Sequence, residues 1–218
     1  MKRCNVEHIR KEFIRLKENK LISDNGTYEI LNASFISNDL VIFGELNEKY
    51  VESEVKWYLS ESRNINDIEG KIPSIWKEVA TKDGLINSNY GWCILSEENG
   101  SQFVNALDKL KNNKLSRQAT MIYIRPSMHA DAVRDGMNDF MCTYSAQLMI
   151  RNDYLYYHVY MRSNDAVFGY KNDSCWHHFI HEWSYKELKK TYKHLRFGPL
   201  FWNAATLHIY PRHFDLIK

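Results

Sequence analysis

Apolar residues near the start of the chain recur at three- and four-residue spacing between Glu, Arg and Lys, at Val6, Ile9, Phe13 and Leu16. This period is typical of an amphipathic helix with one buried face. Similar patterns predict four more helices, over about 47–60, 73–80, 101–110 and 173–183. Strands are predicted where β-branched and aromatic residues lie between turn signals, over about 27–35, 119–124 and 200–210.

Two further β-rich runs lie in CTYSAQLMIRNDYLYYHVYMRS, on either side of Asn152 and Asp153. This pair suits a tight two-residue turn, so the segment predicts a β-hairpin. Counting outward from the turn places Cys142 close to Ser163. Helices and strands alternate without regular βαβ spacing, and we find no linker or internal repeat. The sequence therefore predicts one α/β (α+β) domain over residues 1–218, with helices packed on a mixed sheet.

The composition is that of an ordinary globular protein, with 44% hydrophobic and 26% charged residues. With 29 Lys+Arg against 27 Asp+Glu, the net charge of +2 indicates neither a nucleic-acid nor a membrane partner. The four cysteines have no paired spacing, which favours free thiols in a reducing compartment. The start MKRCNVEHIRKEF lacks a secretory apolar stretch, and no run reaches the roughly 18 apolar residues of a membrane span. We therefore expect a cytoplasmic protein.

Glu54 is the first candidate for chemistry. On the predicted helix, its neighbours one turn away on either side are Tyr50, Val51, Trp57 and Tyr58, so a carboxylate lies in the middle of an aromatic face. Burying a carboxylate is costly unless it is paired or protonated. Periodicity alone favours a rotated helix with Glu54 at the rim, whereas burial would raise its pKa and suit it to proton transfer near neutral pH.

Cys142 is the second candidate, because it lies where a loop enters the first hairpin strand, and such loop borders often carry functional residues. A single cysteine is more often a small buried hydrophobe, and a reactive one needs a nearby cation to stabilise its thiolate. Arg162 closes the opposite arm of the hairpin. Strand pairing therefore brings the thiol beside Arg162 and Ser163, which are also residue types that bind phosphate.

A cysteine and three histidines in one helical segment raise the alternative of a zinc site; they are Cys175, His177, His178 and His181. His177 and His181 share a helix face, but structural zinc needs four converging ligands and catalytic zinc three. Because the chain has no HExxH motif and no second cluster, we expect these residues to occupy helix surface and core and to bind no metal.

Two other groups have ordinary structural interpretations beside functional ones. Residues 89–92 read Asn-Tyr-Gly-Trp and could form a plain aromatic turn around Tyr90. His208 and Tyr210 share one face of the last predicted strand, where both could simply be half-buried side chains with polar tips.

Six segments, in the family's order from about residue 30 to the end of the chain, resemble the thymidylate synthase superfamily. They are SEVKWYL (53–59), INSNYGW (86–92), MIYIRPSM (121–128), DGMNDFMCT (135–143), MRSNDAVFGYKND (161–173) and LHIYPRHF (207–214). Within that superfamily the chain looks most like the phage deoxycytidylate hydroxymethylases. The resemblance implies a thymidylate-synthase-like mixed β-sheet flanked by helices, with one sheet face forming a homodimer.

The resemblance also implies roles for individual residues. Cys142 stands at the position of the nucleophile, Glu54 at that of the glutamate that organises proton transfer through water, and Tyr90 near the centre of proton abstraction. The residues implied in binding the phosphate or the sugar are Arg162, Ser163, His208, Tyr210 and Arg117, the last of which reaches across family dimers to the partner's site. Those implied at the folate site are Asp165 and Trp76.

Asp173 stands where thymidylate synthases have Asn, whose amide both donates to and accepts from the uracil edge. Cytosine presents an amino donor and an unprotonated ring nitrogen instead. A protonated carboxyl group can accept from the first and donate to the second, so Asp173 favours cytosine. A purely structural role, in which Asp173 caps the helix that follows, is also open.

Three departures from the family pattern concern ligand binding. Gln118 stands where many relatives have a second arginine beside Arg117, which removes one charge from the phosphate clamp. The turn SDNGT lacks the family's arginine and has only Lys20 close by. The sequence stops at Lys218, before the tail that covers the ligands in relatives, so we expect this site to close differently or the enzyme to be weak.

The resemblance implies an enzyme that converts dCMP to 5-hydroxymethyl-dCMP, with methylenetetrahydrofolate as co-substrate and no metal. The Cys142 thiolate adds to carbon 6 of the ring, carbon 5 then takes up the one-carbon unit, and water completes the hydroxymethyl group. The alternatives are a CMP 5-hydroxymethylase of nucleoside biosynthesis, a dUMP methylase, and a nucleotide-binding relative without turnover. The implied partners are a pyrimidine nucleoside monophosphate, folate and a second copy of the chain.

Overall fold

A single mixed sheet organises the computed structural model, which describes residues 4–218, so that the first three residues of the basic N-terminal stretch lie outside the described part. The strands follow the order β1-β6-β4-β3-β2, and β5 pairs with β6 beside this path. Their bounds are β1 Tyr28–Ile36, β2 Thr120–Ile122, β3 Thr143–Arg151, β4 Tyr154–Met161, β5 Asn164–Asp165 and β6 Arg196–Ile209. β4 and β5 run parallel to β6 and the other neighbours are antiparallel, which confirms the predicted mixed sheet.

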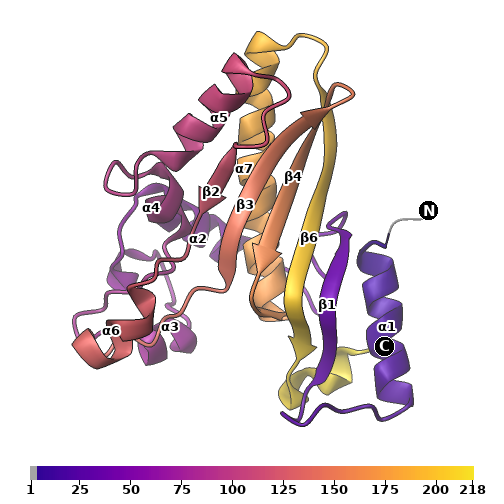
Figure 1. Cartoon of the computed structure of the whole chain (residues 1–218). Helices are drawn as coiled ribbons and strands as arrows, with labels where there is room; N and C mark the ends of the chain where they lie inside the picture. Colours follow the sequence, from indigo (N-terminus) through magenta and orange to yellow (C-terminus); the bar gives the residue numbers. More distant parts are fainter. Residues whose placement is uncertain (1–3) are drawn as a thin grey trace.

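Helices pack on one face of this sheet and at its edges (Figure 1). The α-helices are α1 Val6–Glu18, α2 Glu48–Leu59, α3 Ser74–Val79, α4 Tyr90–Leu95, α5 Gln102–Asn112, α6 Met128–Asp135 and α7 Phe168–Thr191, and two 3-10 helices are η1 Ile65–Asp67 and η2 Pro211–Leu216. The longest, α7, contacts β4 and β6 as well as α2 and α5, whereas α1 lies on β1. Within residues 4–218, no helix has the length and apolar character needed to cross a membrane.

The predicted hairpin is confirmed. Asn152 and Asp153 form its turn with φ of 50° and 62°, a left-handed conformation that Asn and Asp tolerate better than most residues. Strands β3 and β4 pair outward from Arg151 opposite Tyr154. The register therefore brings the ends of the two strands, with the segments on either side of them, to the same edge of the molecule.

The helix predicted over about 173–183 is longer at both ends, because α7 already begins at Phe168. The backbone N–H of Val167 donates to the Asp165 carboxylate at 2.9 Å, so a short polar connection starts the helix directly after β5. At its other end the basic run after residue 186 continues the helix. Asp173 consequently lies inside α7, in its second turn, and the interpretation of this residue as a helix cap is wrong.

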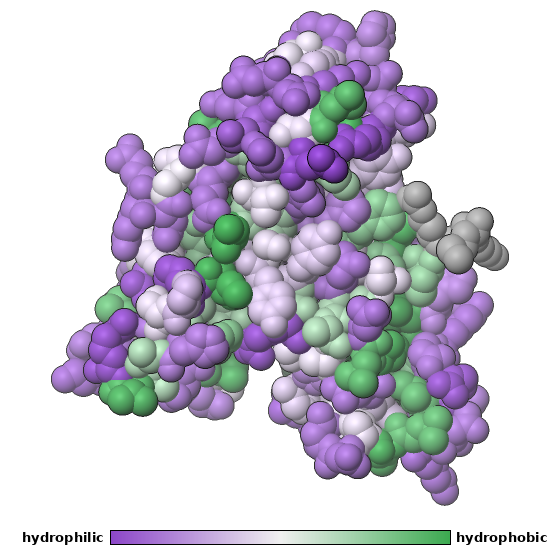
Figure 2. Space-filling view, viewed as in Figure 1, coloured by the Kyte–Doolittle hydropathy of each residue, from purple (hydrophilic) through white to green (hydrophobic). Residues whose placement is uncertain are grey.

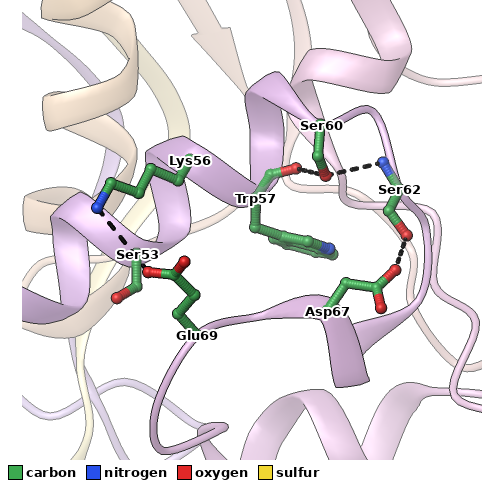
Figure 3. A pocket seen from close by; sticks show the side chains of 7 residues that line it. All are labelled: Ser53, Lys56, Trp57, Ser60, Ser62, Asp67 and Glu69. Atoms are coloured by element: carbon green, nitrogen blue, oxygen red, sulfur yellow. Dashed lines mark hydrogen bonds and ion pairs between the residues drawn. The ribbon is translucent and has the colours of Figure 1, made fainter.

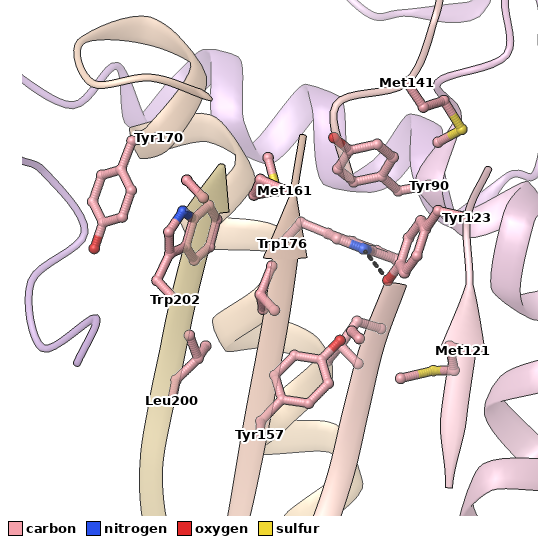
Figure 4. Packing of buried hydrophobic residues seen from close by; sticks show 14 of the residues in the cluster. Tyr90, Met121, Tyr123, Met141, Tyr157, Met161, Tyr170, Trp176, Leu200 and Trp202 are labelled. Carbon is pink, nitrogen blue, oxygen red and sulfur yellow. Dashed lines mark hydrogen bonds between the residues drawn. The ribbon is translucent and has the colours of Figure 1, made fainter. Parts of the chain in front are cut away.

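The core between the sheet and α7 is rich in large aromatic side chains (Figure 4). Trp176 of α7, Tyr157 of β4 and Trp202 of β6 are completely buried. The indole N–H of Trp176 donates to the hydroxyl of Tyr123 at 3.4 Å, next to the end of β2. Aromatic rings of this size contribute much apolar burial and fix the rotation of α7 over the sheet, and with it the direction of Asp173.

Candidate functional site

Cys142 lies one residue before β3, and its main-chain oxygen accepts the N–H of Arg162 at 2.8 Å. This contact confirms that the hairpin brings the two residues together. Cys142 is half-buried, rather than sealed in the core like Cys93. Burial raises the pKa of its thiol to about 11, and the positive charge of Arg162 acts in the opposite direction.

The guanidinium group of Arg162 is held against the chain segment that leads to Cys142. Its Nε donates to the carbonyl of Met141 at 2.9 Å, and Nη2 donates to the carbonyl of Phe140 at 2.5 Å. Ser163 follows directly and is half-buried. Arg162 and Ser163 thus lie at the same edge as the thiol, with one charged and one hydroxyl donor suited to a phosphate.

Glu54 is buried, with 3% of its surface exposed, so the rim position favoured by periodicity is wrong. The physical reason is a hydrogen-bond chain that periodicity does not show. The hydroxyl of Tyr50 donates to Glu54 Oε1 at 2.6 Å, and the indole N–H of Trp76 on α3 donates to that hydroxyl at 3.1 Å. Burial raises the pKa of Glu54 to about 7, while hydrogen bonds from Tyr50 and Tyr58 act to lower it.

Asp173 is a second acidic group in the same place. Asn164 of β5 donates from Nδ2 to Asp173 Oδ2 at 3.0 Å. Burial, followed by the nearby Glu54 carboxylate, raises the pKa of Asp173 to about 8, and hydrogen bonds from Tyr90 and Asn164 partly oppose that rise. A carboxyl group with this pKa is mostly protonated at neutral pH and is therefore able to donate a hydrogen bond.

Tyr90 is the first residue of α4, so residues 89–92 form a helix start and not an aromatic turn. The side chain of Asn89 caps this start by accepting the N–H of Trp92 at 2.7 Å. The Tyr90 ring stacks on Tyr58 with centroids 5.2 Å apart, and Thr143 donates to its hydroxyl at 3.0 Å. Burial raises the pKa of Tyr90, as do the charges of Asp173 and Cys142.

The structure thus brings four predicted residues close enough for their charges to affect one another's pKa values. They are Cys142, Glu54, Tyr90 and Asp173, and Asp173 interacts with each of the other three. They come from the loop before β3, from α2, from α4 and from α7. Figure 2 shows a notch in the outline of the molecule, between the part that carries α3 and α6 and the part that carries β1 and α1. The group combines a thiol with two carboxyl groups that gain and lose protons near neutral pH. These are the residue types that nucleophilic and acid–base catalysis requires.

His208, Tyr210 and Asp165 form a neighbouring cluster. β5 places Asp165 directly opposite His208 of β6. The His208 and Tyr210 rings meet edge to face at 4.9 Å, which confirms that they share one side of the strand end. His208 is buried, which lowers its pKa and so favours the neutral ring, whereas Tyr210 is exposed. A neutral imidazole beside an exposed hydroxyl can both donate to and accept from a ligand.

Arg117 is not part of this group within its own chain. It is exposed, and its main-chain oxygen accepts the side-chain N–H of Gln147 at 2.7 Å. Gln147 lies five residues along β3 from Cys142, a separation of roughly 17 Å at the usual rise of a strand. The backbone of Arg117 therefore lies beside β3, well away from Cys142.

The four residues of the zinc alternative lie on two sides of α7, with His177 and His181 against the sheet and Cys175 and His178 lining a pocket together. His177 and His181 are completely buried and pair with β4, through the Tyr157 hydroxyl at 3.3 Å and the Leu155 carbonyl at 3.1 Å. His178 instead contacts the Ser37 hydroxyl at 3.2 Å. Across the described part of the chain, no three His, Cys, Asp or Glu side chains gather as metal ligands would. Burial lowers the pKa of His177 to about 3, so it is a neutral core residue.

A separate small pocket is lined by residues of α2 and of the segment that follows it (Figure 3). Trp57 forms its floor, and Lys56 pairs with Glu69 across one end at 3.8 Å. At the other end Ser62 donates to Asp67. It contains none of the predicted site residues.

Sequence reasoning gave no role to Tyr50, Tyr58 or Asn164, all of which contact the acidic pair. Tyr50 and Tyr58 were visible only as the aromatic neighbours of Glu54 on the predicted helix. Asn164 lies inside the matched segment MRSNDAVFGYKND, but nine positions separate it from Asp173, and no local pattern indicates that their side chains meet.

The architecture and the site define a class of protein. The structure aligns with the thermostable thymidylate synthase A from Bacillus subtilis with a TM-score of 0.68 and 19% identity, covering 94% of this chain and 81% of that one. The thymidylate synthase sequence profile matches residues 34–218, and the chain belongs to the thymidylate synthase family. The deoxycytidylate 5-hydroxymethyltransferase of Enterobacteria phage T4 is 43% identical over 97% of this chain and 89% of its own length. The thymidylate synthase of Bacillus atrophaeus is 27% identical over 74% of this chain and 69% of its own.

Proposed function

We propose that this chain is a deoxycytidylate 5-hydroxymethyltransferase, which converts dCMP to 5-hydroxymethyl-dCMP with methylenetetrahydrofolate and water. The observation that carries this proposal is Asp173, a carboxyl with a pKa raised to about 8, in the same group as a half-buried cysteine. The 43% identity to the phage T4 deoxycytidylate 5-hydroxymethyltransferase, over nearly the whole chain, supports the same substrate.

Cys142 acts as the nucleophile. When its sulfur adds to carbon 6 of cytosine, electrons move through carbon 4 to the ring nitrogen N3, which needs a proton. Asp173 is protonated at neutral pH and supplies that proton, and in the same pose its other oxygen accepts from the exocyclic amino group. Burial raises the pKa of the free thiol, and the positive charge of Arg162 opposes that rise and so favours the thiolate.

Glu54 serves as the acid–base group for the later steps. Its pKa of about 7 lets it both take and return a proton, and the Trp76–Tyr50–Glu54 chain holds its carboxyl in one orientation. Tyr90 lies against the same acidic pair and is held by Thr143. These side chains orient the water that becomes the hydroxyl of the product and accept the proton it loses.

Trp76 and Asp165 are the residues we assign to the folate. The half-buried Trp76 ring offers an aromatic edge next to Glu54, and the half-buried Asp165 carboxylate offers acceptor oxygens for the N–H groups of a pterin. This donor and acceptor set fits such a ligand, which supplies the one-carbon unit when bound. We assign phosphate binding to Arg162 and Ser163. We assign hydrogen bonding to the sugar hydroxyl to His208 and Tyr210, whose rings contact each other.

A homodimer completes the phosphate site in this proposal. The sheet face turned away from α7 carries an aromatic stripe, in which His158 stacks on Phe201 at 4.8 Å and Tyr156 stacks on the same ring at 6.0 Å. Exposed Tyr160 extends the stripe. Aromatic residues on an open face are suited to an interface. Pairing two chains through this face directs Arg117 to the partner's site; the whole chain then acts as one cytoplasmic domain per subunit.

The experiment is a product assay with purified protein, methylenetetrahydrofolate and dCMP, CMP or dUMP, read by mass spectrometry. We expect dCMP to gain CH2O. A gain of CH2 on dUMP would instead identify a methylase, and preferential turnover of CMP would identify a ribonucleotide enzyme. Binding of all three nucleotides without any change in their mass would refute the enzymatic proposal.

A further inference from the structure

Asn164 is almost completely buried, with 2% of its surface exposed. Its side chain makes one hydrogen bond to a residue of the site, Asp173. Nδ2 donates to Asp173 Oδ2 at 3.0 Å, whereas Oδ1 is buried and, among residues 4–218, finds no hydrogen-bond partner. An unpartnered buried carbonyl is costly and calls for an explanation. The Asn164 amide is thus oriented so that its N–H donates to Asp173, while its own oxygen is left without a hydrogen bond.

The surrounding chain leaves room for this contact. Gly169 lies in the first turn of α7 between the two residues. A Cβ atom at that position would lie 3.2 Å from Asn164 Nδ2 and 3.8 Å from Asp173 Oδ2. Because the φ of Gly169 is not left-handed, the backbone does not require glycine there. Its missing side chain instead keeps space beside the amide–carboxyl pair.

We propose that Asn164 is the residue that makes Asp173 discriminate cytosine from uracil, by holding Oδ2 as the hydrogen-bond acceptor that faces position 4 of the base. This inference rests on the proposed function and deepens it. Asn164 acts through Asp173 and is therefore a positioning residue.

A neutral carboxyl group alone cannot make this distinction. It has one donor oxygen and one acceptor oxygen, and moving the proton from one to the other exchanges the pattern. With the proton on Oδ1 the group reads N3 and the amino group of cytosine. With the proton on Oδ2 it reads the N3–H and the carbonyl of uracil equally well. Selectivity requires a neighbour that makes the two proton positions unequal.

Asn164 makes the two proton positions on Asp173 unequal, because more hydrogen bonds are satisfied with cytosine bound than with uracil bound. With cytosine, Oδ2 of Asp173 accepts from both Asn164 Nδ2 and the amino group, and nothing is lost. With uracil, the proton must sit on Oδ2, which then becomes a poor acceptor for Asn164. Reversing the Asn164 amide would make its oxygen compete with the uracil carbonyl for a single proton. An amide at position 173 has two N–H groups and could serve both acceptors.

The same contact affects the acidity of Asp173. The titratable groups that interact with Asp173 lie on several parts of the chain. They are Tyr50, Glu54 and Tyr58 of α2, Tyr90 of α4, Tyr123 after β2, Cys142 before β3, Asp165 of β5 and Cys175 of α7 itself. Glu54 and Asp165 raise the pKa of Asp173, and Asn164 and Tyr90 lower it. Removing the Asn164 N–H should therefore raise that pKa further, which a purely structural role for Asn164 would not do.

The test is a double-mutant cycle with Asn164→Leu, Asp173→Asn and the double variant. For each protein, kcat/KM is measured with dCMP and with dUMP. We expect Asn164→Leu to lower the dCMP/dUMP ratio about tenfold when residue 173 is Asp, the size of one lost buried hydrogen bond. The same change should leave the ratio nearly unaltered in the Asp173→Asn background. The alkaline limb of the dCMP pH profile should also move to higher pH in Asn164→Leu.

Equal changes in both backgrounds, or an unchanged ratio with Asp173 in place, would overturn the inference. If circular dichroism shows that Asn164→Leu does not fold, Asn164→Ser takes its place, and its hydroxyl donor should keep part of the preference. Equilibrium binding of dCMP and dUMP without folate gives the same ratio independently of turnover. A wild-type protein that binds both nucleotides but turns over neither would refute the proposed function, while the binding ratios would still decide the role of Asn164.

Discussion

The main-chain N–H of Arg162 donates to the main-chain oxygen of Cys142 at 2.8 Å, across the mouth of the β3–β4 hairpin. This bond holds the backbone of Arg162, whose positive charge lowers the pKa of the thiol, beside the residue that carries the thiol. Arg162 contacts all three residues of the segment that ends in Cys142, because its guanidinium group also donates to the carbonyls of Phe140 and Met141. In the proposed function, one arginine therefore couples the position of the nucleophile to phosphate binding.

Cys142→Ala should abolish turnover of dCMP and leave nucleotide binding nearly intact, because sulfur is needed only for the covalent step. Loss of activity is measured with the mass assay and binding by equilibrium dialysis. Cys175→Ala is the matched control, since Cys175 is also a half-buried free thiol of the described chain but lines a different pocket, together with Leu40 and His178. Comparable rates in Cys142→Ala and the wild type would exclude the covalent mechanism.

The pH dependence of kcat/KM for dCMP should have an alkaline limb near pH 8. The proposed role of Asp173 needs the protonated form, and its pKa is raised to about 8, so activity falls as pH rises through that value. In Asp173→Asn no proton is lost, and this limb should disappear while dUMP gains relative to dCMP. A limb that persists unchanged in Asp173→Asn would assign it to another group.

Glu54→Gln should stabilise the ligand-free protein at pH 8. The folded state holds the Glu54 proton up to a pKa of about 7, against 4.5 for an ordinary glutamate, so the folded chain binds more protons and stability falls as pH rises from 4.5 to 7. The difference corresponds to about 3 kcal/mol at pH 8. Gln keeps an acceptor for Tyr50 without the buried charge. Urea unfolding at pH 4.5 and pH 8 checks this: equal stability of variant and wild type at pH 8 contradicts the buried, proton-binding Glu54.

Gly91→Ala should destabilise the protein by about 3 kcal/mol or more, because overpacking against backbone cannot relax by a rotamer change. A Cβ at this position would lie 1.8 Å from the main-chain oxygen of Tyr58, so α2 and α4 would have to separate. The free energy of unfolding in urea measures the effect. Val133→Ala, at a side chain that is 93% exposed, should stay within about 0.5 kcal/mol of the wild type. If Gly91→Ala changed the free energy of unfolding as little as Val133→Ala, α2 and α4 could not lie as close together as the structure places them.

Mixing two inactive variants tests the role of Arg117 in trans. Arg117→Ala and Cys142→Ala should each be inactive as homodimers, whereas mixed dimers contain one site with both an intact thiol and an intact partner arginine. Denaturing and refolding the mixture should therefore restore activity, and size-exclusion chromatography should show dimers. No recovery in a mixture that does form dimers would mean that Arg117 does not act on the partner's site.

Local patterns were enough to predict much of the fold. The period of Val6, Ile9, Phe13 and Leu16 gave α1, and the Asn152–Asp153 turn gave the hairpin with its register, because both depend on neighbouring residues. The bounds of α7 could not be predicted in this way. Its two ends are set by β5 and by the basic run after residue 186, and its buried side chains face both the sheet and neighbouring helices, so no single apolar stripe marks it.

The contacts of the site likewise include some that local sequence patterns predict and some that they do not. The meeting of Cys142 and Arg162 follows from strand register and was predictable. Burial of Glu54 was not, because the partner that completes its hydrogen-bond chain, Trp76, comes from a different helix. The Asn164–Asp173 contact likewise depends on how β5 and α7 are placed in three dimensions, which no residue spacing in the sequence encodes.

The central claim is a transient bond between the Cys142 sulfur and carbon 6 of a cytosine nucleotide. It is tested most directly with 5-fluoro-dCMP and methylenetetrahydrofolate, since fluorine at carbon 5 cannot leave as a proton and the adduct stalls. After denaturation and digestion, mass spectrometry should find the nucleotide, joined to the one-carbon unit and folate, on the peptide that contains Cys142. An active enzyme whose Cys142 peptide stays unmodified, or which carries the adduct on another residue, would contradict the account.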